Sequence, residues 1–257
     1  MLPENGFLNG KVGLVVGIAN AHSIAAGCAT AFAASGAELC VTFQDERSRQ
    51  FVEPVATSVD AGLFLPLDVT DTAQTEAVFA EIEKTWGKLD FLLHSIAFCP
   101  RDDLHGRVVD CSRDGFATAM DVSVHSLIRL ARHAEPLMAD GGTILTVSYH
   151  GAEKVVDHYN IMGPVKAALE ATTRYLAVEL GHKKIRVNAL SPGPLETRAA
   201  SGIDHFDALI DDARTRAPLH RLTTIGEVGA MAACLVSDFA RSVSGNTEYI
   251  DGGHHVV

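Results

Sequence analysis

Strand-like apolar runs alternate with helix-like segments from one end of this chain to the other. The strand-like runs cover residues 11–16, 38–44, 63–67, 91–97, 143–148, 185–190 and 248–250. Helices are expected at residues 22–35, 45–59, 72–86, 114–138, 159–180 and 227–237. Strands joined through helices of this length need crossover connections, which build a parallel sheet covered by helices on both faces. The alternation therefore predicts an α/β fold with a doubly wound parallel sheet.

The chain is expected to form a single domain, residues 1–257, because it shows no repeat, low-complexity segment or linker. One stretch, between Pro192 and about Pro218, breaks the alternation with an irregular run of small residues and short helical pieces. An irregular insertion after the carboxyl end of a strand is a usual place for a substrate lid, although a plain surface excursion has the same pattern. We predict a substrate-binding loop at about residues 195–218.

The charge balance argues against two classes of partner. The formal net charge is −11, whereas nucleic acids and anionic membranes attract clustered lysine and arginine. No apolar run approaches the length of a bilayer span, and the first ten residues lack the pattern of a signal peptide or basic transit segment. Five scattered cysteines without a C-x-x-C pair suit a reducing compartment, and the twelve histidines lack metal-ligand spacing. We expect a cytoplasmic protein that binds no nucleic acid, membrane or metal.

The first strand enters its helix through a turn of small residues, Gly-Ile-Ala-Asn-Ala-His-Ser-Ile-Ala-Ala-Gly, at positions 17–27. Small residues let the backbone approach a pyrophosphate, and the helix N-terminus adds unpaired N–H groups and the positive end of its dipole. Tight packing of helix on strand would also favour small residues here. The turn predicts a dinucleotide site of the Rossmann type, with Gly17, Ala19, Ser23 and Ile24 among its residues.

A second motif places Tyr149 ten residues before Tyr159, and Tyr159 seven residues before Lys166. Seven helical residues turn through about 700°, so Tyr159 and Lys166 are expected on one helix face, roughly 10 Å apart along the axis. A lysine there can hold the ribose hydroxyls of a cofactor. The phenol can donate a hydrogen bond to the oxygen of an enolate as its charge develops. The plain alternative is a buried tyrosine and a surface lysine on an ordinary helix.

Both motifs resemble the divergent branch of the short-chain dehydrogenase/reductase family, the enoyl-acyl-carrier-protein reductases of bacterial fatty acid biosynthesis. Ordinary members carry their tyrosine at the position of Met162 and glycines at the positions of Ser23 and Ala25. The Tyr-x6-Lys spacing with a second tyrosine upstream is the signature of the enoyl branch. The resemblance implies reduction of the 2,3 double bond of an enoyl thioester, with catalytic Tyr149, Tyr159 and Lys166, in a homotetramer.

The resemblance covers essentially the whole chain and implies further cofactor contacts. They are Asp68 and Val69 at the adenine, Ser95, Ile96 and Ala97 at the riboses, Lys166 at the nicotinamide ribose, and Leu195 and Thr197 at the carboxamide and pyrophosphate. Apart from Lys166, these positions follow the carboxyl ends of strands, where open α/β sheets bind ligands. Gln44, followed by Asp45 and Glu46, favours NADH over NADPH because carboxylates repel a 2′-phosphate. Arg47 is the residue that could reverse this preference.

Some positions depart from the family pattern. His150 stands where an apolar residue is expected, and Pro164 fits only if its helix begins close to Tyr159. The family usually places basic residues after the substrate loop to receive an acidic carrier protein, whereas residues 204–212 here contain four aspartates. The substrate is therefore expected either on an unusual acyl carrier protein, docked through Arg198, Arg214 and Arg216, or on a smaller thiol such as coenzyme A.

Two other functions stay open at the level of sequence. One is a short-chain enzyme that reduces a ketone or oxidises a secondary alcohol, against which Met162 argues. The other is a non-catalytic dinucleotide sensor, which would need neither Tyr159 nor Lys166.

Overall fold

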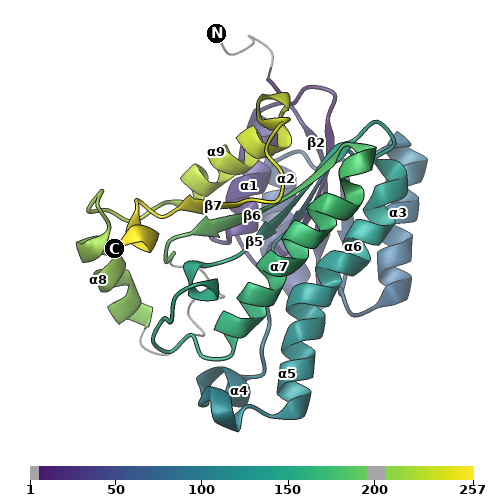
Figure 1. Ribbon diagram of the computed structural model, residues 1–257. Coiled ribbons are helices and arrows are strands. Elements are labelled where there is room, and N and C mark those ends of the chain that lie inside the picture. The colour runs from purple at the N-terminus through teal and green to yellow at the C-terminus, as the bar shows by residue number, and fades with distance from the viewer. Residues whose placement is uncertain (1–5, 196–205) are drawn as a thin grey trace.

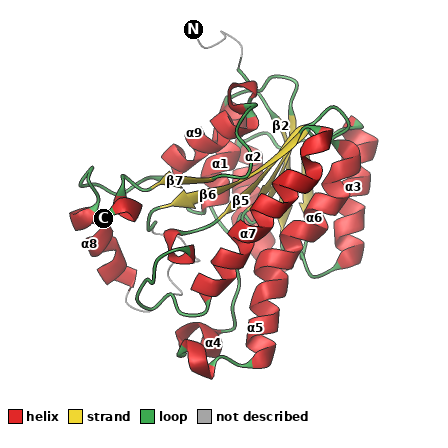
Figure 2. Ribbon diagram, in the orientation of Figure 1, coloured by secondary structure: helices red, strands yellow, loops and turns green. Residues whose placement is uncertain are grey.

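The computed structural model describes residues 6–195 and 206–257, with no account of the side chains of residues 206–208. Within the described residues, seven parallel strands form one sheet in the order β3-β2-β1-β4-β5-β6-β7 (Figures 1 and 2). The strands are β1 (Val12–Val16), β2 (Glu38–Phe43), β3 (Leu63–Pro66), β4 (Phe91–His94), β5 (Gly142–Val147), β6 (Ile185–Pro192) and β7 (Thr247–Ile250). The strand order reverses between β1 and β4, and the carboxyl edge of the sheet at such a point is where Rossmann folds bind their ligands. The predicted fold class is confirmed.

Helices cover both faces of the sheet. They are α1 (Ile24–Ala34), α2 (Glu46–Ser58), α3 (Thr72–Trp86), α4 (Arg101–His105), α5 (Arg113–Met120), α6 (Ser126–Ala134), α7 (Met162–Leu180), α8 (Phe206–Arg216) and α9 (Ile225–Val236). Side chains of α3, α6 and α7 form one apolar core with the sheet, and those of α1, α2 and α9 form a second core on the opposite face. Figure 1 shows α6 and α7 side by side in front of the sheet.

The central strand β1 explains why its sequence is continuously apolar. Leu14 and Val16 belong to the first core, whereas Val15 belongs to the second. Successive side chains of a strand point to opposite faces, so a strand covered on both faces needs apolar residues at every position.

Several helices and strands begin or end at residues other than those predicted from the sequence. β4 ends at His94 rather than at residue 97, since β1 beside it has ended at Val16. The long helix expected at 114–138 is interrupted by a π-helical turn, Asp121–His125, between α5 and α6. Ser126 follows that turn and donates its hydroxyl to the Val122 carbonyl, four residues back, a bond that often bends helices. α4 was not expected, and the helix expected from residue 159 begins at Met162.

Among the described residues, no helix is both long and apolar enough to cross a membrane. The same residues contain no cluster of three or more His, Cys, Asp or Glu side chains arranged to hold a metal ion.

Candidate active site

Two tyrosine rings meet beyond the carboxyl end of β5. Tyr149 follows the strand by two residues, and its ring contacts that of Tyr159 edge to face, with centroids 4.9 Å apart. Gly151 makes this contact possible, because a Cβ there would lie 2.7 Å from Cδ1 of Tyr159 and 3.1 Å from Cδ1 of Tyr149. Burial raises the pKa of both phenols, so both remain protonated hydrogen-bond donors at neutral pH.

Lys166 lies in the first turns of α7 and is 5% exposed. Its Nζ donates to the carbonyl oxygen of Val147, 2.6 Å away, at the end of β5. Burial lowers the pKa of the ammonium to about 8, and the nearby carboxylate of Glu170 opposes that change. The lysine is therefore buried, oriented by a backbone oxygen and charged at neutral pH.

The expected helical phase of Tyr159 and Lys166 is wrong. Tyr159 precedes α7 and lies in a turn flanked by His158 and Asn160, whose φ angles are 63° and 45°. Asn160 fixes the turn by donating its side-chain amide to the Leu104 carbonyl, 2.8 Å away. The residues from Tyr159 to Lys166 are therefore not all helical, and the two side chains do not share a helix face. The two residues still reach the same edge of the sheet.

Pro164 is the third residue of α7. The backbone nitrogens of a first helical turn have no carbonyl partner within the helix, so a proline there removes no hydrogen bond. The expectation that this helix begins close to Tyr159 is met, with a start three residues later.

The β1–α1 turn has features that suit a dinucleotide. Gly17 has φ of 107°, and a Cβ there would lie 2.1 Å from the carbonyl oxygen of Ser95, so only glycine fits. Ser23 is the N-cap residue of α1, yet its hydroxyl donates to the Asn20 carbonyl instead of capping the helix amides. The Ser23 side chain therefore does not cap the Ile24 and Ala25 amides at the start of α1, which suits an anionic group there, whereas the Ala26 amide donates to the Ser23 carbonyl.

The adenine-side candidates also come together. Asp68, which follows β3, accepts hydrogen bonds from the Thr70 amide and hydroxyl, and its carboxyl is hydrogen-bonded to Gln44 beyond β2. Burial works to raise the pKa of Asp68, but the hydrogen bonds from Thr70 and Gln44 lower it overall. Val69 directs its carbonyl oxygen to Arg129 of α6, 2.8 Å away.

The remaining cofactor candidates lie around the same edge. Ser95 and Ile96 are half-buried and lie beside Gly17, whereas Ala97 is exposed. Ala19 and Ile24 line the β1–α1 turn. Leu195 shares an apolar cluster with Ile18 and Val147. Thr197 lies outside the described residues. A buried polar atom at this edge supports a ligand site, since Ser191 Oγ at the end of β6 has no hydrogen-bond partner among the described residues. These residues fit a dinucleotide.

Two buried polar residues near the site were not among the sequence candidates. Glu170 accepts a hydrogen bond from Ser148 Oγ at 2.5 Å, and His94 lies between Thr146 and Ser126 at 2.9 and 2.7 Å. Burial lowers the pKa of His94 to about 3, so its ring is neutral. Only the folded sheet brings these residues together, and no spacing in the sequence indicates the contacts.

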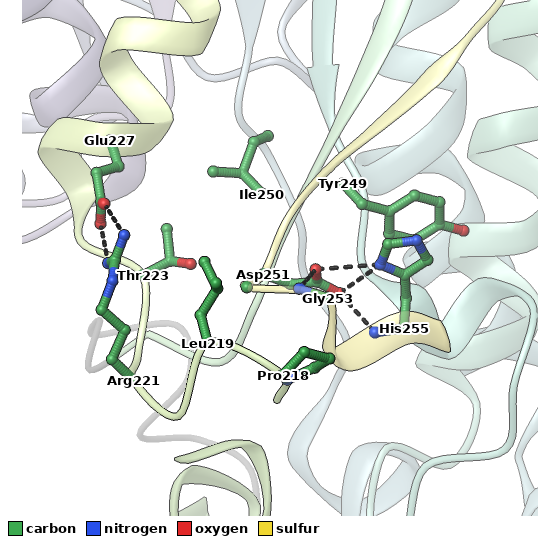
Figure 3. Close-up of a pocket in the computed structure, with 11 residues that line it drawn as sticks. Pro218, Leu219, Arg221, Thr223, Glu227, Tyr249, Ile250, Asp251, Gly253 and His255 are labelled. Carbon is green, nitrogen blue, oxygen red and sulfur yellow. Dashed lines mark hydrogen bonds and ion pairs between the residues drawn. The ribbon is translucent and has the colours of Figure 1, made fainter. Parts of the chain in front are cut away.

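The closing turn after β7 borders a separate pocket of about 500 Å³ (Figure 3). Asp251 accepts hydrogen bonds from the amides of Gly253 and His255, and the His255 ring stacks on Tyr249 with centroids 3.8 Å apart. Arg221 and Glu227 pair across the other side of the pocket at 2.6 Å. Tyr149, Tyr159 and Lys166 do not line this pocket, so it is not the site described above.

A doubly wound sheet with a tyrosine and a buried lysine at its carboxyl edge defines an oxidoreductase of the short-chain dehydrogenase/reductase class. Residues 17–255 match the model of the family described as enoyl-(acyl carrier protein) reductase. The chain belongs to this family, as its resemblance predicts.

Similar proteins cover the chain from end to end. The enoyl-acyl-carrier-protein reductase (NADH) 1 of Rhizobium meliloti is 49% identical, covering 100% of this chain and 94% of that protein. A crystal structure of the reductase from Anaplasma phagocytophilum in complex with NAD has a TM-score of 0.95 at 45% identity, covering 100% of this chain and 98% of that one. The Bacillus cereus reductase with NADP+ and indole naphthyridinone has a TM-score of 0.95 at 44% identity, covering 98% of each chain.

Proposed function

We propose that this protein reduces the 2,3 double bond of enoyl thioesters with NADH in fatty acid biosynthesis. The observation that supports it most is the contact between half-buried Tyr149 and buried Tyr159, whose ring centroids lie 4.9 Å apart beyond β5, where Lys166 donates to the end of the same strand. We assign Tyr159, Tyr149 and Lys166 as the catalytic residues.

Bound NADH supplies a hydride for conjugate addition to the β-carbon of the substrate. Tyr159 donates a hydrogen bond to the thioester carbonyl oxygen, which becomes negative as the enolate forms. Uptake of one proton from solvent at the α-carbon then completes the reduction and restores the thioester carbonyl. Tyr149 supports the Tyr159 ring through its edge-to-face contact and borders the bound substrate. The Lys166 ammonium binds ribose hydroxyls and adds a positive field to the site. Because the Tyr159 phenol and the Lys166 ammonium are buried, little water competes for their hydrogen bonds.

The test is an assay of NADH consumption with a panel of 2-enoyl thioesters, run beside ketones and secondary alcohols. Reduction of the enoyl thioesters alone supports the proposal. Activity confined to ketones or alcohols, or NADH binding without turnover on any substrate, would contradict it.

The charges on α8 bear on which thiol carries the acyl group of the substrate. Part of the predicted substrate loop, residues 206–216, is the helix α8. Both arginines of α8 are paired on their own helix, Arg214 with Asp211 at 3.1 Å and Arg216 with Asp212 at 3.4 Å. Asp212 also accepts from His254 Nε2 at 3.2 Å, which joins α8 to the C-terminal turn (Figure 1). We infer that this helix attracts an acidic carrier protein weakly, and that either a carrier protein docks elsewhere or coenzyme A thioesters are used.

We further propose a homotetramer in the cytoplasm. Large apolar side chains are exposed on two pairs of neighbouring elements: Tyr175 and Val178 on α7 with Ile128 on α6, and Met231 on α9 with Phe239 in the turn that follows it. Exposed apolar patches of this kind support contacts with other copies of the chain. Five free thiols and a reduced cofactor suit a reducing compartment. Light scattering on Val178→Glu against the unaltered protein tests the first surface, since a buried carboxylate would disrupt it.

A further inference from the structure

Glu170 is a buried carboxylate next to the proposed catalytic residues, and it has no part in the reaction described above. It is 3% exposed and lies one helical turn after Lys166 on α7. Its Oε1 accepts the Ser148 hydroxyl at 2.5 Å, a distance typical of a hydroxyl bound to an ionised carboxylate. Burial raises the pKa of Glu170, while the hydrogen bond from Ser148 and the Lys166 ammonium oppose that rise and favour the carboxylate, which places a negative charge in the interior near Lys166.

Lys166 and Glu170 hold the same short piece of chain. Lys166 donates to the carbonyl of Val147, and Glu170 accepts from the side chain of Ser148, the residue before Tyr149. Residues four apart lie on one helix face, about 6 Å from each other along the axis. A cation and an anion of α7 are thus both bound to the segment that leads from β5 to Tyr149.

The groups around this pair come from several elements. Arg174 on α7, Glu153 after the His150–Ala152 turn, Tyr159 before α7, Tyr249 on β7 and His94 on β4 interact electrostatically with Glu170 or Lys166. Arg174 and Glu153 are exposed to solvent, which screens their charges, and His94 is neutral. Glu170 is the buried anion that acts on Lys166, and it opposes the loss of the lysine proton caused by burial.

We propose that Glu170 is a positioning residue of the reductase, whose carboxylate fixes Ser148 below Tyr149 and keeps the Lys166 ammonium charged in its buried place. This inference rests on the proposed role of Lys166 in binding the cofactor ribose. Without the anion, Lys166 would lose its proton at a lower pH, and the site would lose its positive charge within the neutral range.

The test is Glu170→Gln, which preserves the side-chain volume and an acceptor oxygen for Ser148 but removes the charge. Two quantities are measured against pH: kcat/KM with a short 2-enoyl thioester, and NADH affinity from fluorescence without substrate. We expect the alkaline decline of both to move to lower pH by about one unit or more, as expected for charges at this separation in a protein interior. Unchanged alkaline declines in both measurements would overturn the proposal.

Glu179→Gln is the matched control, because it removes the same charge from an exposed position of the same helix. It should leave both profiles in place. Ser148→Ala should move them in the same direction by less, since an ionised Glu170 then lacks its hydrogen bond. If Glu170→Gln does not fold, as shown by its thermal unfolding, Ser148→Ala decides, and an unshifted profile rejects the proposal.

Different results would contradict the proposed function and the proposed role of Glu170. A natural protein that reduces no 2-enoyl thioester would contradict the function, whereas the NADH-affinity profiles would still report on Glu170 and Lys166. A fully active natural protein whose Glu170→Gln variant keeps the same pH profiles would contradict the inference alone.

Discussion

Gly27 of α1 and Gly229 of α9 face each other where the two helices cross. A Cβ on Gly229 would lie 2.4 Å from the Gly27 carbonyl oxygen, and a Cβ on Gly27 would lie 2.5 Å from the Ile225 carbonyl oxygen. The backbones therefore touch, and neither position has room for a side chain. The last glycine of the β1–α1 turn is thus explained by contact between helices rather than by contact with a nucleotide.

Gly27→Ala should therefore destabilise the fold. We expect the free energy of unfolding to fall by about 1–3 kcal/mol, as for other overpacked cores, because the new methyl meets backbone that cannot move aside easily. Chemical denaturation measures the change. Gly181→Ala is the control, since a Cβ there would meet nothing within 4 Å. NADH affinity of the folded variant should be close to that of the natural protein, and a selective loss of that affinity would argue for a nucleotide contact at Gly27.

Tyr159→Phe should lower turnover and leave cofactor binding nearly intact. The variant keeps the edge-to-face ring contact with Tyr149 and removes the hydroxyl to which we assign the hydrogen bond to the enolate oxygen. Loss of one oxyanion donor commonly costs about 2–4 kcal/mol of transition-state stabilisation, or roughly 10²–10³ in kcat. Steady-state kinetics and NADH titration separate the two effects. If Tyr159→Phe keeps full activity and Tyr149→Phe does not, the donor is Tyr149.

Lys166 predicts the pH dependence of the natural enzyme. Its pKa is lowered from 10.5 to about 8, so the ammonium is present below that pH and is lost as the pH rises through it. If the charged form binds the ribose, kcat/KM and NADH affinity should both decline above about pH 8. Lys166→Ala should bind NADH weakly at every pH and show no such decline. An alkaline decline that persists in Lys166→Ala would have to come from another group.

The parts of this molecule that sequence could predict are those set by local pattern. The continuous apolar run of β1 follows from burial on both faces, and the Tyr-x6-Lys spacing identified the family. The same spacing predicted the wrong geometry, because Asn160 within it and His158 just before it have positive φ, which an α-helix does not contain. Glu170 could not be found at all, since its partner Ser148 is 22 residues away and is reached only when β5 and α7 pack.

The residues that follow β2 should make the enzyme prefer NADH over NADPH. The Asp45 carboxylate caps α2 by accepting from the Ser48 amide at 2.8 Å, and that bond lowers the pKa of Asp45, so the charge persists beside exposed Gln44. A fixed anion there repels a 2′-phosphate. The measurement is kcat/KM with each cofactor, for the natural enzyme and for Asp45→Asn. The ratio of kcat/KM for NADH to that for NADPH should be smaller in the variant. A clear NADPH preference of the natural enzyme would assign the dominant role to Arg47 instead.

Recognition of the acyl carrier depends on two arginines of α8 whose charges are already neutralised by aspartates of the same helix. An acidic carrier protein needs a local positive patch to dock, even on an enzyme that is acidic overall. Arg214 and Arg216 are engaged by Asp211 and Asp212 on the same exposed helix, while Arg198 lies outside the described residues. We therefore expect one enoyl chain to be reduced with similar kcat/KM on acyl carrier protein and on coenzyme A, with weak dependence on salt. The double variant Asp211→Asn with Asp212→Asn frees both arginines, so it should raise kcat/KM for the carrier-bound substrate at low salt only. A natural enzyme that strongly prefers the carrier protein, and loses that preference at high salt, would show that the paired arginines still suffice for docking.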